Sequence, residues 1–312
     1  MRRTTPLLVA GALALTGGAV ASATITQKPK PGELRVVALG GAAGAQTLQI
    51  IDTGQPTKAP GRARVITGLQ AGDALVGIDF RPATGELIGL ARNGTTLKTY
   101  GINYITAAAT KKADLVGAMG AATEGRPIVA DPNAEYTIDV NPNVPLNTTP
   151  QLGALRIVSS TGQNLRVPNI DAGGTATDGT LKDASGAAVT GIQGIGYTNS
   201  EPTPNTATQT LLYDINTTDD TLRLQQPPNN GDVSTTIGRL DLGVDVTSAD
   251  FDIYPVLQGG RTIANVGIGV FTSSAGQILA RVDVTSGLAI SQGPVPNPIS
   301  DIAVLYPQNY KG

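Results

Sequence analysis

The sequence of 312 residues contains no His, no Cys and no Trp, and only three Phe. Without His and Cys the chain can have no Ser-His-Asp or Cys-His nucleophile, no imidazole or thiolate zinc site and no disulfide. Any chemistry must therefore use carboxylates, hydroxyls, amides, Lys, Arg or Tyr. The lack of Trp also removes the largest ring for stacking against a sugar.

Charge is scarce as well. Only 15% of the residues are charged, and 22 Lys and Arg against 24 Asp and Glu give a net charge of −2. Phosphate backbones are bound by clustered Lys and Arg, and the sequence shows no such cluster. Nucleic acid is therefore not an expected partner.

The first residues are typical of an export signal. Arg2 and Arg3 precede an apolar run, Pro6 to Val20, which ends in Ala21-Ser22-Ala23. This order of a charged segment, an apolar segment and a small-residue cleavage site predicts a signal peptide over residues 1–23. A membrane anchor or a buried helix is the alternative, but the run is short and rich in Gly and Ala.

A leader that is cleaved near Ala23 predicts where the protein goes, and the residues that follow it predict how the rest of the chain is organised. We expect a secreted or periplasmic protein with no membrane span after cleavage. Residues 24–33 contain two Pro close together and are interpreted as a linker. Residues 34–312 are predicted to form one folded domain.

Beyond the linker, the pattern favours strands over helices. Turn residues (Gly, Pro, Asn and Thr) recur every 8–12 residues, which is typical of an all-β sandwich or barrel. A unit of four strands over 73–117 is followed by three further units of the same kind. A repeated four-stranded meander predicts a β-propeller, with a two-domain β-sandwich as the alternative.

The two ends of the domain indicate how the ring closes. One strand is left over at 300–307, and three strands (ELRVVALGG, QTLQIID and ARVITGL) precede the first full unit. One C-terminal and three N-terminal strands complete a fifth blade, so we predict five blades. Six blades are the alternative, since five would average about 58 residues each against about 40–50 in common repeats.

Four stretches carry a family resemblance. They are GIDFRPATGELIGL (77–90), LRIVSSTGQNLRV (155–167), GIGYTNS (194–200) and LYDINTTDDTLRLQQPPNNG (212–231). With them the chain resembles, over roughly residues 34–305, a bacterial family known only as domain of unknown function 4394. The resemblance implies a secreted, propeller-like protein, and it implies no activity and no catalytic residues.

Acidic residues recur on the first strand of several units. The candidates for both catalysis and metal binding are Asp79, Asp139, Asp252 and Asp301. First strands line the axis of a propeller, so these carboxylates would converge there. They would suit calcium, or two of them could act as acid and base on a glycan. The alternative is that each Asp accepts hydrogen bonds from backbone groups. In the third unit Gln193 or Gly196 takes this position.

A second candidate site involves two arginines. Arg156 and Arg166 flank the STGQN turn on adjacent predicted strands. Two guanidinium groups so placed can grip an anionic ligand. An exposed face, or an ion pair with an Asp, is the alternative interpretation.

Together these observations favour a non-catalytic role over an enzyme. We expect an exported propeller that serves as a binding or structural module in the cell envelope or outside the cell. Its expected partner is an envelope protein or a glycan, and no cofactor is predicted apart from a possible calcium ion. The alternatives are a carboxylate-based glycan hydrolase and a calcium-binding propeller.

Overall fold

The computed structural model describes five stretches of the chain: residues 34–58, 61–143, 152–203, 209–295 and 297–306. The predicted signal peptide and linker lie outside these described residues. Within them the protein is built from strands, with a single 3₁₀ turn, η1 (Pro228–Asn230). No helix in this part of the chain has the length and apolar character needed to cross a membrane.

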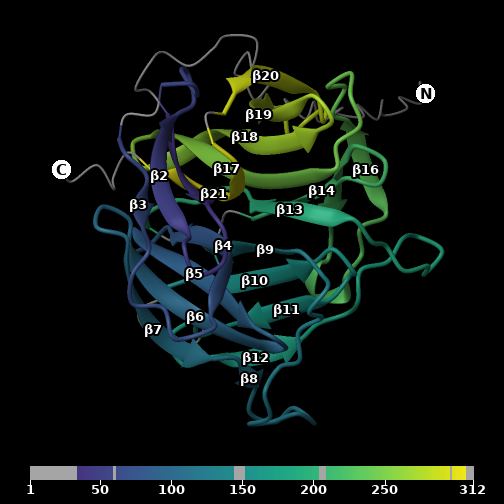
Figure 1. The fold of residues 1–312 in the computed structure, drawn as a ribbon. Coiled ribbons are helices and arrows are strands. Elements are labelled where there is room, and N and C mark those ends of the chain that lie inside the picture. The colour runs from purple at the N-terminus through teal and green to yellow at the C-terminus, as the bar shows by residue number, and fades with distance from the viewer. Residues whose placement is uncertain (1–33, 59–60, 144–151, 204–208, 296, 307–312) are drawn as a thin grey trace, which may run out of the picture.

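The strands form five antiparallel sheets that stand around a common axis as the blades of a propeller (Figure 1). In every blade the first strand named below lies innermost, at the axis, and the others follow outward. Blade 1 consists of β21 (Ile299–Leu305), β1 (Arg35–Gly40), β2 (Thr47–Asp52) and β3 (Arg64–Val65). Blade 2 consists of β4 (Ala74–Arg81), β5 (Glu86–Asn93), β6 (Thr96–Asn103) and β7 (Ala108–Asp114).

The other three blades follow in chain order around the axis. Blade 3 consists of β9 (Tyr136–Asn141), β10 (Ala154–Ser159), β11 (Asn164–Val167) and β12 (Gly174–Thr177). Blade 4 consists of β13 (Ile192–Tyr197), β14 (Leu212–Asn216), β15 (Thr221–Gln225) and β16 (Thr235–Arg239). Blade 5 consists of β17 (Ser248–Gln258), β18 (Arg261–Ser273), β19 (Gly276–Val282) and β20 (Ala289–Pro294).

The prediction of five blades is confirmed, and so is the way in which the ring closes. The last strand, β21, pairs antiparallel with β1, so that Arg35 lies opposite Leu305 and Val37 opposite Ala303. Blade 1 is therefore made from both ends of the domain. The inner strands β21, β4, β9, β13 and β17 contact one another in turn around the axis. The pairing with β21 covers the edge of β1 that would otherwise be open.

Blade 3 departs from the four-stranded pattern. A two-residue strand, β8 (Val116–Gly117), follows β7 of blade 2 but pairs in parallel with β12 of blade 3. The chain thus ties blade 2 to the outer edge of blade 3 before it enters β9.

The apolar core lies between the blades. One cluster of buried side chains joins blades 1, 2 and 5, a second joins blades 2 and 3, and a third joins blades 4 and 5. Between blades 3 and 4 the cluster is the smallest of the four, with Ile195, Tyr197 and Leu212 among its members. Polar side chains occupy the rest of that interface, and the pocket described below lies there.

Candidate functional site

The five inner strands place their inward-facing residues in two layers around the axis, with one residue from each strand in each layer. The first axial layer consists of Asp79, Asp139, Gly196, Asp252 and Ala303, and the second axial layer of Gly77, Thr137, Gly194, Asp250 and Asp301. Successive layers are two residues apart on each strand, as the alternation of side chains in a β-strand requires. Every acid in the two layers is buried, with 2 to 7% of its surface exposed.

Each polar side chain in these layers accepts a hydrogen bond from a backbone N–H of the next blade. In the first layer Asp79 accepts from Val140 (2.7 Å) and Asp252 from Val304 (2.6 Å). The N–H of Tyr197 donates to Asp139.

The second layer repeats this arrangement. Thr137 accepts from the N–H of Ile195 at 3.2 Å, Asp250 from Ile302, and Asp301 from Ile78. Blade 4 has glycine in both layers. The interface with blade 5 is instead joined by Gln193, one residue before Gly194 on β13, whose side-chain oxygen accepts the N–H of Ala249 at 3.3 Å. All five blade interfaces are thus joined in the same rotational sense.

The glycines of blade 4 have a steric cause. A Cβ atom on Gly194 would lie 2.7 Å from Cβ of Phe251, and one on Gly196 would lie 2.9 Å from Cγ1 of Ile253. Phe251 and Ile253 of blade 5 therefore fill the space that a side chain at either position of blade 4 would need.

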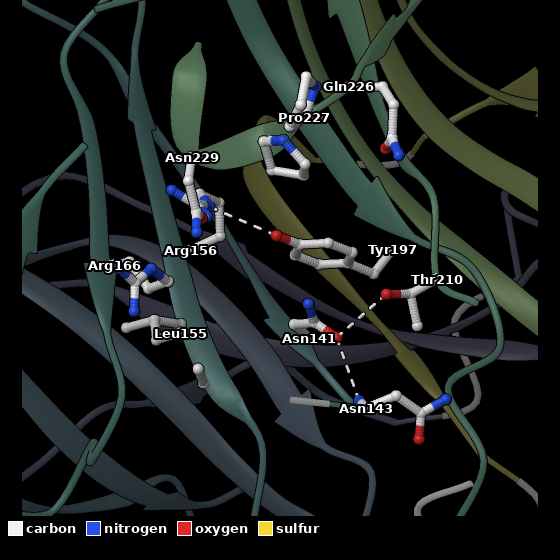
Figure 2. Close-up of a pocket in the computed structure, with 12 residues that line it drawn as sticks. Asn141, Asn143, Leu155, Arg156, Arg166, Tyr197, Thr210, Gln226, Pro227 and Asn229 are labelled. Atoms are coloured by element: carbon white, nitrogen blue, oxygen red, sulfur yellow. Dashed lines mark hydrogen bonds between the residues drawn. The ribbon is translucent and has the colours of Figure 1, made fainter. Parts of the chain in front are cut away.

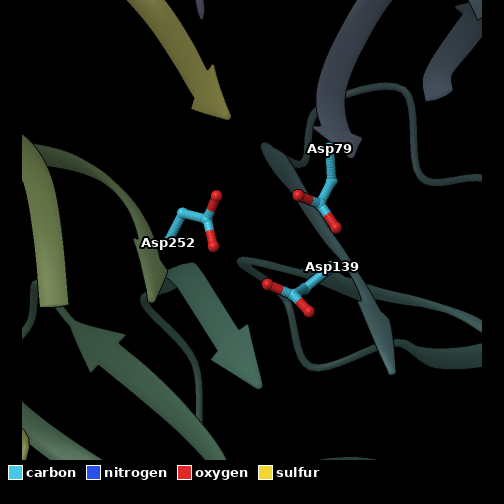
Figure 3. Close-up of side chains that lie close together, drawn as sticks. All are labelled: Asp79, Asp139 and Asp252. Carbon is cyan, nitrogen blue, oxygen red and sulfur yellow. The ribbon is translucent and has the colours of Figure 1, made fainter. Parts of the chain in front are cut away.

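The first layer brings three of the predicted acids together. One oxygen from each of Asp79, Asp139 and Asp252 lies within 4.8 Å of the others, and Figure 3 shows the three carboxyl groups facing a common space. Burial raises the pKa of Asp79 and Asp139 well above the usual range, and the neighbouring carboxylates raise it further. Burial likewise raises the pKa of Asp252 to about 6. Three ionised carboxylates at this distance would repel strongly unless a proton or a cation lay between them.

Asp139 differs from its two neighbours. In Asp79 and Asp252 the oxygen that does not reach the next blade accepts the N–H of the following residue, Phe80 or Ile253. The corresponding N–H for Asp139 belongs to Val140, which donates to Asp79 instead. Oδ1 of Asp139 is consequently buried without a hydrogen-bond partner. This oxygen is the best placed of the layer to take a proton or a cation.

The fourth predicted acid does not join this group. Asp301 lies in the second layer, where its side chain is hydrogen-bonded to that of Asp250. Burial raises the pKa of Asp250 to about 6, and burial together with Asp250 raises the pKa of Asp301 well above its usual range. Sequence reasoning missed Asp250, although the Asp-Phe-Asp order of β17 places Asp250 and Asp252 on one face of the strand.

The interblade pocket, a cavity of about 260 Å³, lies between blades 3 and 4. Figure 2 shows polar side chains around it from β9, β10 and β13 and from the segment that follows β15. Its polar lining residues are Asn141, Asn143, Arg156, Arg166, Tyr197, Thr210, Gln226 and Asn229. The remainder of the lining is supplied by Ala154, Leu155, Pro227 and Pro228.

Arg156 is the buried centre of this pocket, and its side chain is 2% exposed. Its Nε donates to the hydroxyl of Tyr197 (3.3 Å), and its Nη2 donates to Oδ1 of Asn229 (2.7 Å). Its Nη1 donates to Asn164 and Asp178, both at 2.8 Å. Burial disfavours the charged form, but Tyr197 and Asp178 outweigh burial and raise the pKa of Arg156.

Arg166 lies nearer the mouth of the pocket. Its Nε and Nη2 donate to the two oxygens of Asp178 at 3.1 and 3.2 Å, and its side chain is 29% exposed. The expected ion pair with an Asp is thus present, and one carboxylate serves both arginines. Asp178, Gln226 and Asn229 were not predicted as site residues, because they come from segments that only the folded chain brings together.

The axis and the pocket are neighbours. Asp139, Arg156 and Arg166 lie opposite one another across β9, β10 and β11, and residues so paired share one face of a sheet. Tyr197 connects the two places, since its N–H donates to Asp139 and its hydroxyl accepts from Arg156.

Comparison with known proteins identifies a family but no characterised relative. The family model described as domain of unknown function (DUF4394) matches residues 47–303. No curated protein matches the sequence. An auxiliary nutrient binding protein from Bacteroides ovatus has a TM-score of 0.39 and 11% identity over 78% of this chain, which spans 58% of that protein.

Two other solved structures are similar at the same level. BBS1N, in complex with ARL6DN, has a TM-score of 0.40 and 15% identity, with 85% of this chain and 83% of that chain covered. Apo AztD from Citrobacter koseri has a TM-score of 0.31 and 12% identity, with 86% of this chain and 62% of that chain covered.

Proposed function

We propose that this chain, which belongs to the DUF4394 family, is an exported, non-catalytic binding module of the cell envelope or the extracellular space, and that it holds a small polar ligand in the interblade pocket. One observation carries the proposal. The polar side chains that remain open to solvent, such as Gln226 and Asn229, converge with two arginines on one cavity, whereas the acids are closed inside the ring.

The surroundings of the axial acids support a structural role over glycan hydrolysis. The oxygens of Asp79 and Asp252 lie close enough together for a retaining glycosidase, which uses carboxyl groups about 5 Å apart. A hydrolase, however, needs its acids open to the sugar. Both oxygens of Asp79 and of Asp252 accept backbone N–H groups, and neither residue lines the interblade pocket.

A ligand screen that also records turnover tests the proposal. We expect the melting temperature of the protein without its leader to rise with one class of small polar molecule, and no product to appear. Release of reducing sugar that is lost in Asp79→Asn would contradict the non-catalytic role. A pocket variant such as Gln226→Ala should lose the thermal shift, while an exposed substitution on blade 1, Arg64→Gln, should keep it.

Export is tested separately. Expression of the full chain in a bacterial host, followed by N-terminal sequencing of the secreted or periplasmic protein, should give Thr24 as the first residue. An intact N-terminus in the cytosol would contradict the proposed export. Substitution of Ala21 and Ala23 by bulky residues should block cleavage, because the signal peptidase accepts small residues at these positions.

A second candidate function, cation binding on the axis, is favoured by the unpaired Oδ1 of Asp139. Calcium prefers carboxylate oxygens, and the three acids of the first layer would supply them. We expect calcium to raise the melting temperature at pH 7.5, and Asp139→Asn to abolish that rise. If calcium has no effect above pH 7, protons rather than a cation hold the three carboxyls together.

A further inference from the structure

We propose that the ligand of the interblade pocket is a small hydroxylated monocarboxylate, a compound of the sugar-acid class. This inference rests on the proposed binding function and adds the chemistry of the ligand. It follows from the charges, the donors and the size of the pocket, in that order.

The charges leave one positive unit at the pocket. Arg156 and Arg166 both donate to Asp178, so two guanidinium groups share one carboxylate. An arginine in a protein keeps its charge throughout the physiological range. A buried charge without a counterion is costly, and an anionic group bound here would lower that cost.

Two further acids lie near Arg156: Asp139, which is opposite it on β9 and bonds to the N–H of Tyr197, and Asp214, on β14 of blade 4. Asp214 is fully buried, and neither of its oxygens has a hydrogen-bond partner. Burial raises the pKa of Asp214 well above its usual range, against a smaller opposing effect of Arg156 and Arg223. Among the described residues Asp178 is the carboxylate that forms ion pairs with the two arginines, and Asp214, which makes none, does not balance the second guanidinium.

The donors around the cavity match a carboxylate. Arg166 uses Nε and Nη2 on Asp178, and Nη1 belongs to the same partly exposed guanidinium, which lines the pocket. A guanidinium of this kind pairs with carboxylates through parallel N–H groups. One positive unit suits a single carboxylate better than a phosphate dianion, because the second charge of the dianion would have no counterion.

The remaining walls match hydroxyl groups. Asn141, Asn143, Gln226 and Asn229 present side-chain amides, and amides both donate to and accept from hydroxyls. The cavity of about 260 Å³ lies just below the usual range for drug-sized ligands, roughly 300–1,000 Å³. A cavity of this volume suits a single sugar ring or an open-chain hydroxy acid. The amides can bind the hydroxyl groups of such a ligand without an aromatic ring for stacking.

The experiment compares matched pairs of acid and neutral sugar. Galacturonate with galactose, glucuronate with glucose, and inorganic phosphate would be titrated into the protein by calorimetry at pH 7.5. We expect at least one acid to bind about tenfold or more tightly than its neutral partner, as a charge-assisted hydrogen bond provides. Phosphate is expected to bind more weakly than that acid.

Variants locate the charge. Arg166→Gln should remove the preference for the acid, Arg166→Lys should retain part of it, and the exposed control Arg64→Gln should leave it intact. Asp214→Asn should change the affinity less than twofold if Asp214 is neutral, whereas tighter acid binding in this variant would show that Asp214 is ionised and would overturn the charge argument.

The outcomes separate this inference from the proposed function. Equal binding of acid and neutral sugars would overturn the monocarboxylate and keep the binding module. Preference for phosphate would also overturn it. If no compound binds and the broader screen also finds no ligand that depends on Gln226, the proposed function fails together with this inference.

Discussion

The axis and the interblade pocket both bury aspartate, but they satisfy it in opposite ways. In the part of the chain that the structure describes, the axial acids bond to backbone N–H groups of the next blade and to one another. Asp178 at the pocket bonds to two guanidinium groups. A backbone N–H can donate to a protonated or an ionised carboxyl, whereas guanidinium groups pair with carboxylates through charge-assisted hydrogen bonds. The two regions therefore differ in the donors that their buried acids meet rather than in burial.

The largest effect is expected from removing the buried guanidinium. Arg156→Met should lower the free energy of unfolding by about 3 to 5 kcal/mol, because Asn164 and Tyr197 would each lose a donor inside the protein and Asp178 would lose one of its two guanidinium partners. Urea unfolding followed by far-UV circular dichroism measures the change. A loss below about 1 kcal/mol would mean that the pocket is not a structural centre of the interface between blades 3 and 4.

A smaller effect is expected on the axis. Asp79→Ala should cost about 2 to 3 kcal/mol, because it leaves the buried N–H groups of Phe80 and Val140 without an acceptor. Asp79→Asn keeps one acceptor oxygen and should cost about half as much. Equal losses in both variants, measured by the same unfolding curves, would show that the negative charge itself is needed and would favour a bound cation.

The buried acids of the axis make the stability of the fold depend on pH. Burial raises the pKa of both Asp250 and Asp252 to about 6, above the unfolded value of about 3.9. Between these values the folded protein binds more protons than the unfolded one, so this contribution is complete below pH 4 and is lost as pH rises through 6. We expect a loss of about 2 kcal/mol or more from these two groups.

The control for this prediction is the variant Asp252→Asn, which should show a shallower decline between pH 4 and pH 7. The free energy of unfolding must be compared between the wild-type protein and this variant at each pH, because acids with a lowered pKa make the protein more stable as the pH rises. At Asp73, for example, hydrogen bonds from Lys98 and Tyr100 outweigh burial and lower the pKa. A parallel pair of curves would contradict the assignment of the decline to the axis.

The smallest effect is expected at the surface. Lys111 and Asp114 form an ion pair of 2.7 Å on β7, and both side chains are partly open to water. Such pairs contribute little, so Lys111→Ala should change the free energy of unfolding by less than about 0.5 kcal/mol. A larger change would mean that the unfolding assay does not discriminate the buried pairs from the exposed ones.

The sequence was sufficient for the ring and for most of the axis. Alternating strands and regular turns predicted four-stranded units, and the strand left over at the C-terminus predicted closure with the N-terminal strands. Asp79, Asp139 and Asp252 could be predicted as neighbours because the first strand of each blade lines the axis of a propeller. The alternative interpretation, that axial acids accept from the backbone, describes their contacts in the structure.

The layers and the pocket could not be predicted in the same way. Asp301 lies one layer from Asp252, because the packing of neighbouring blades sets which positions meet and the strand pattern repeats every two residues. The pocket depends on Asp178 and Asn229, which lie 51 positions apart and approach only when blades 3 and 4 are in place. Arg156 and Arg166 were visible in the sequence, but the single carboxylate between them was not.

The closing strand β21 also has a consequence in time. It is the last strand to be synthesised, and its partner β1 is the first. Until β21 emerges, β1 lacks its inner partner strand. The N–H of Ile78 on β4 likewise has no Asp301 to accept its hydrogen bond. The domain therefore reaches its closed form only after β21 is available, since the contact that completes the ring joins two strands that lie far apart in the sequence.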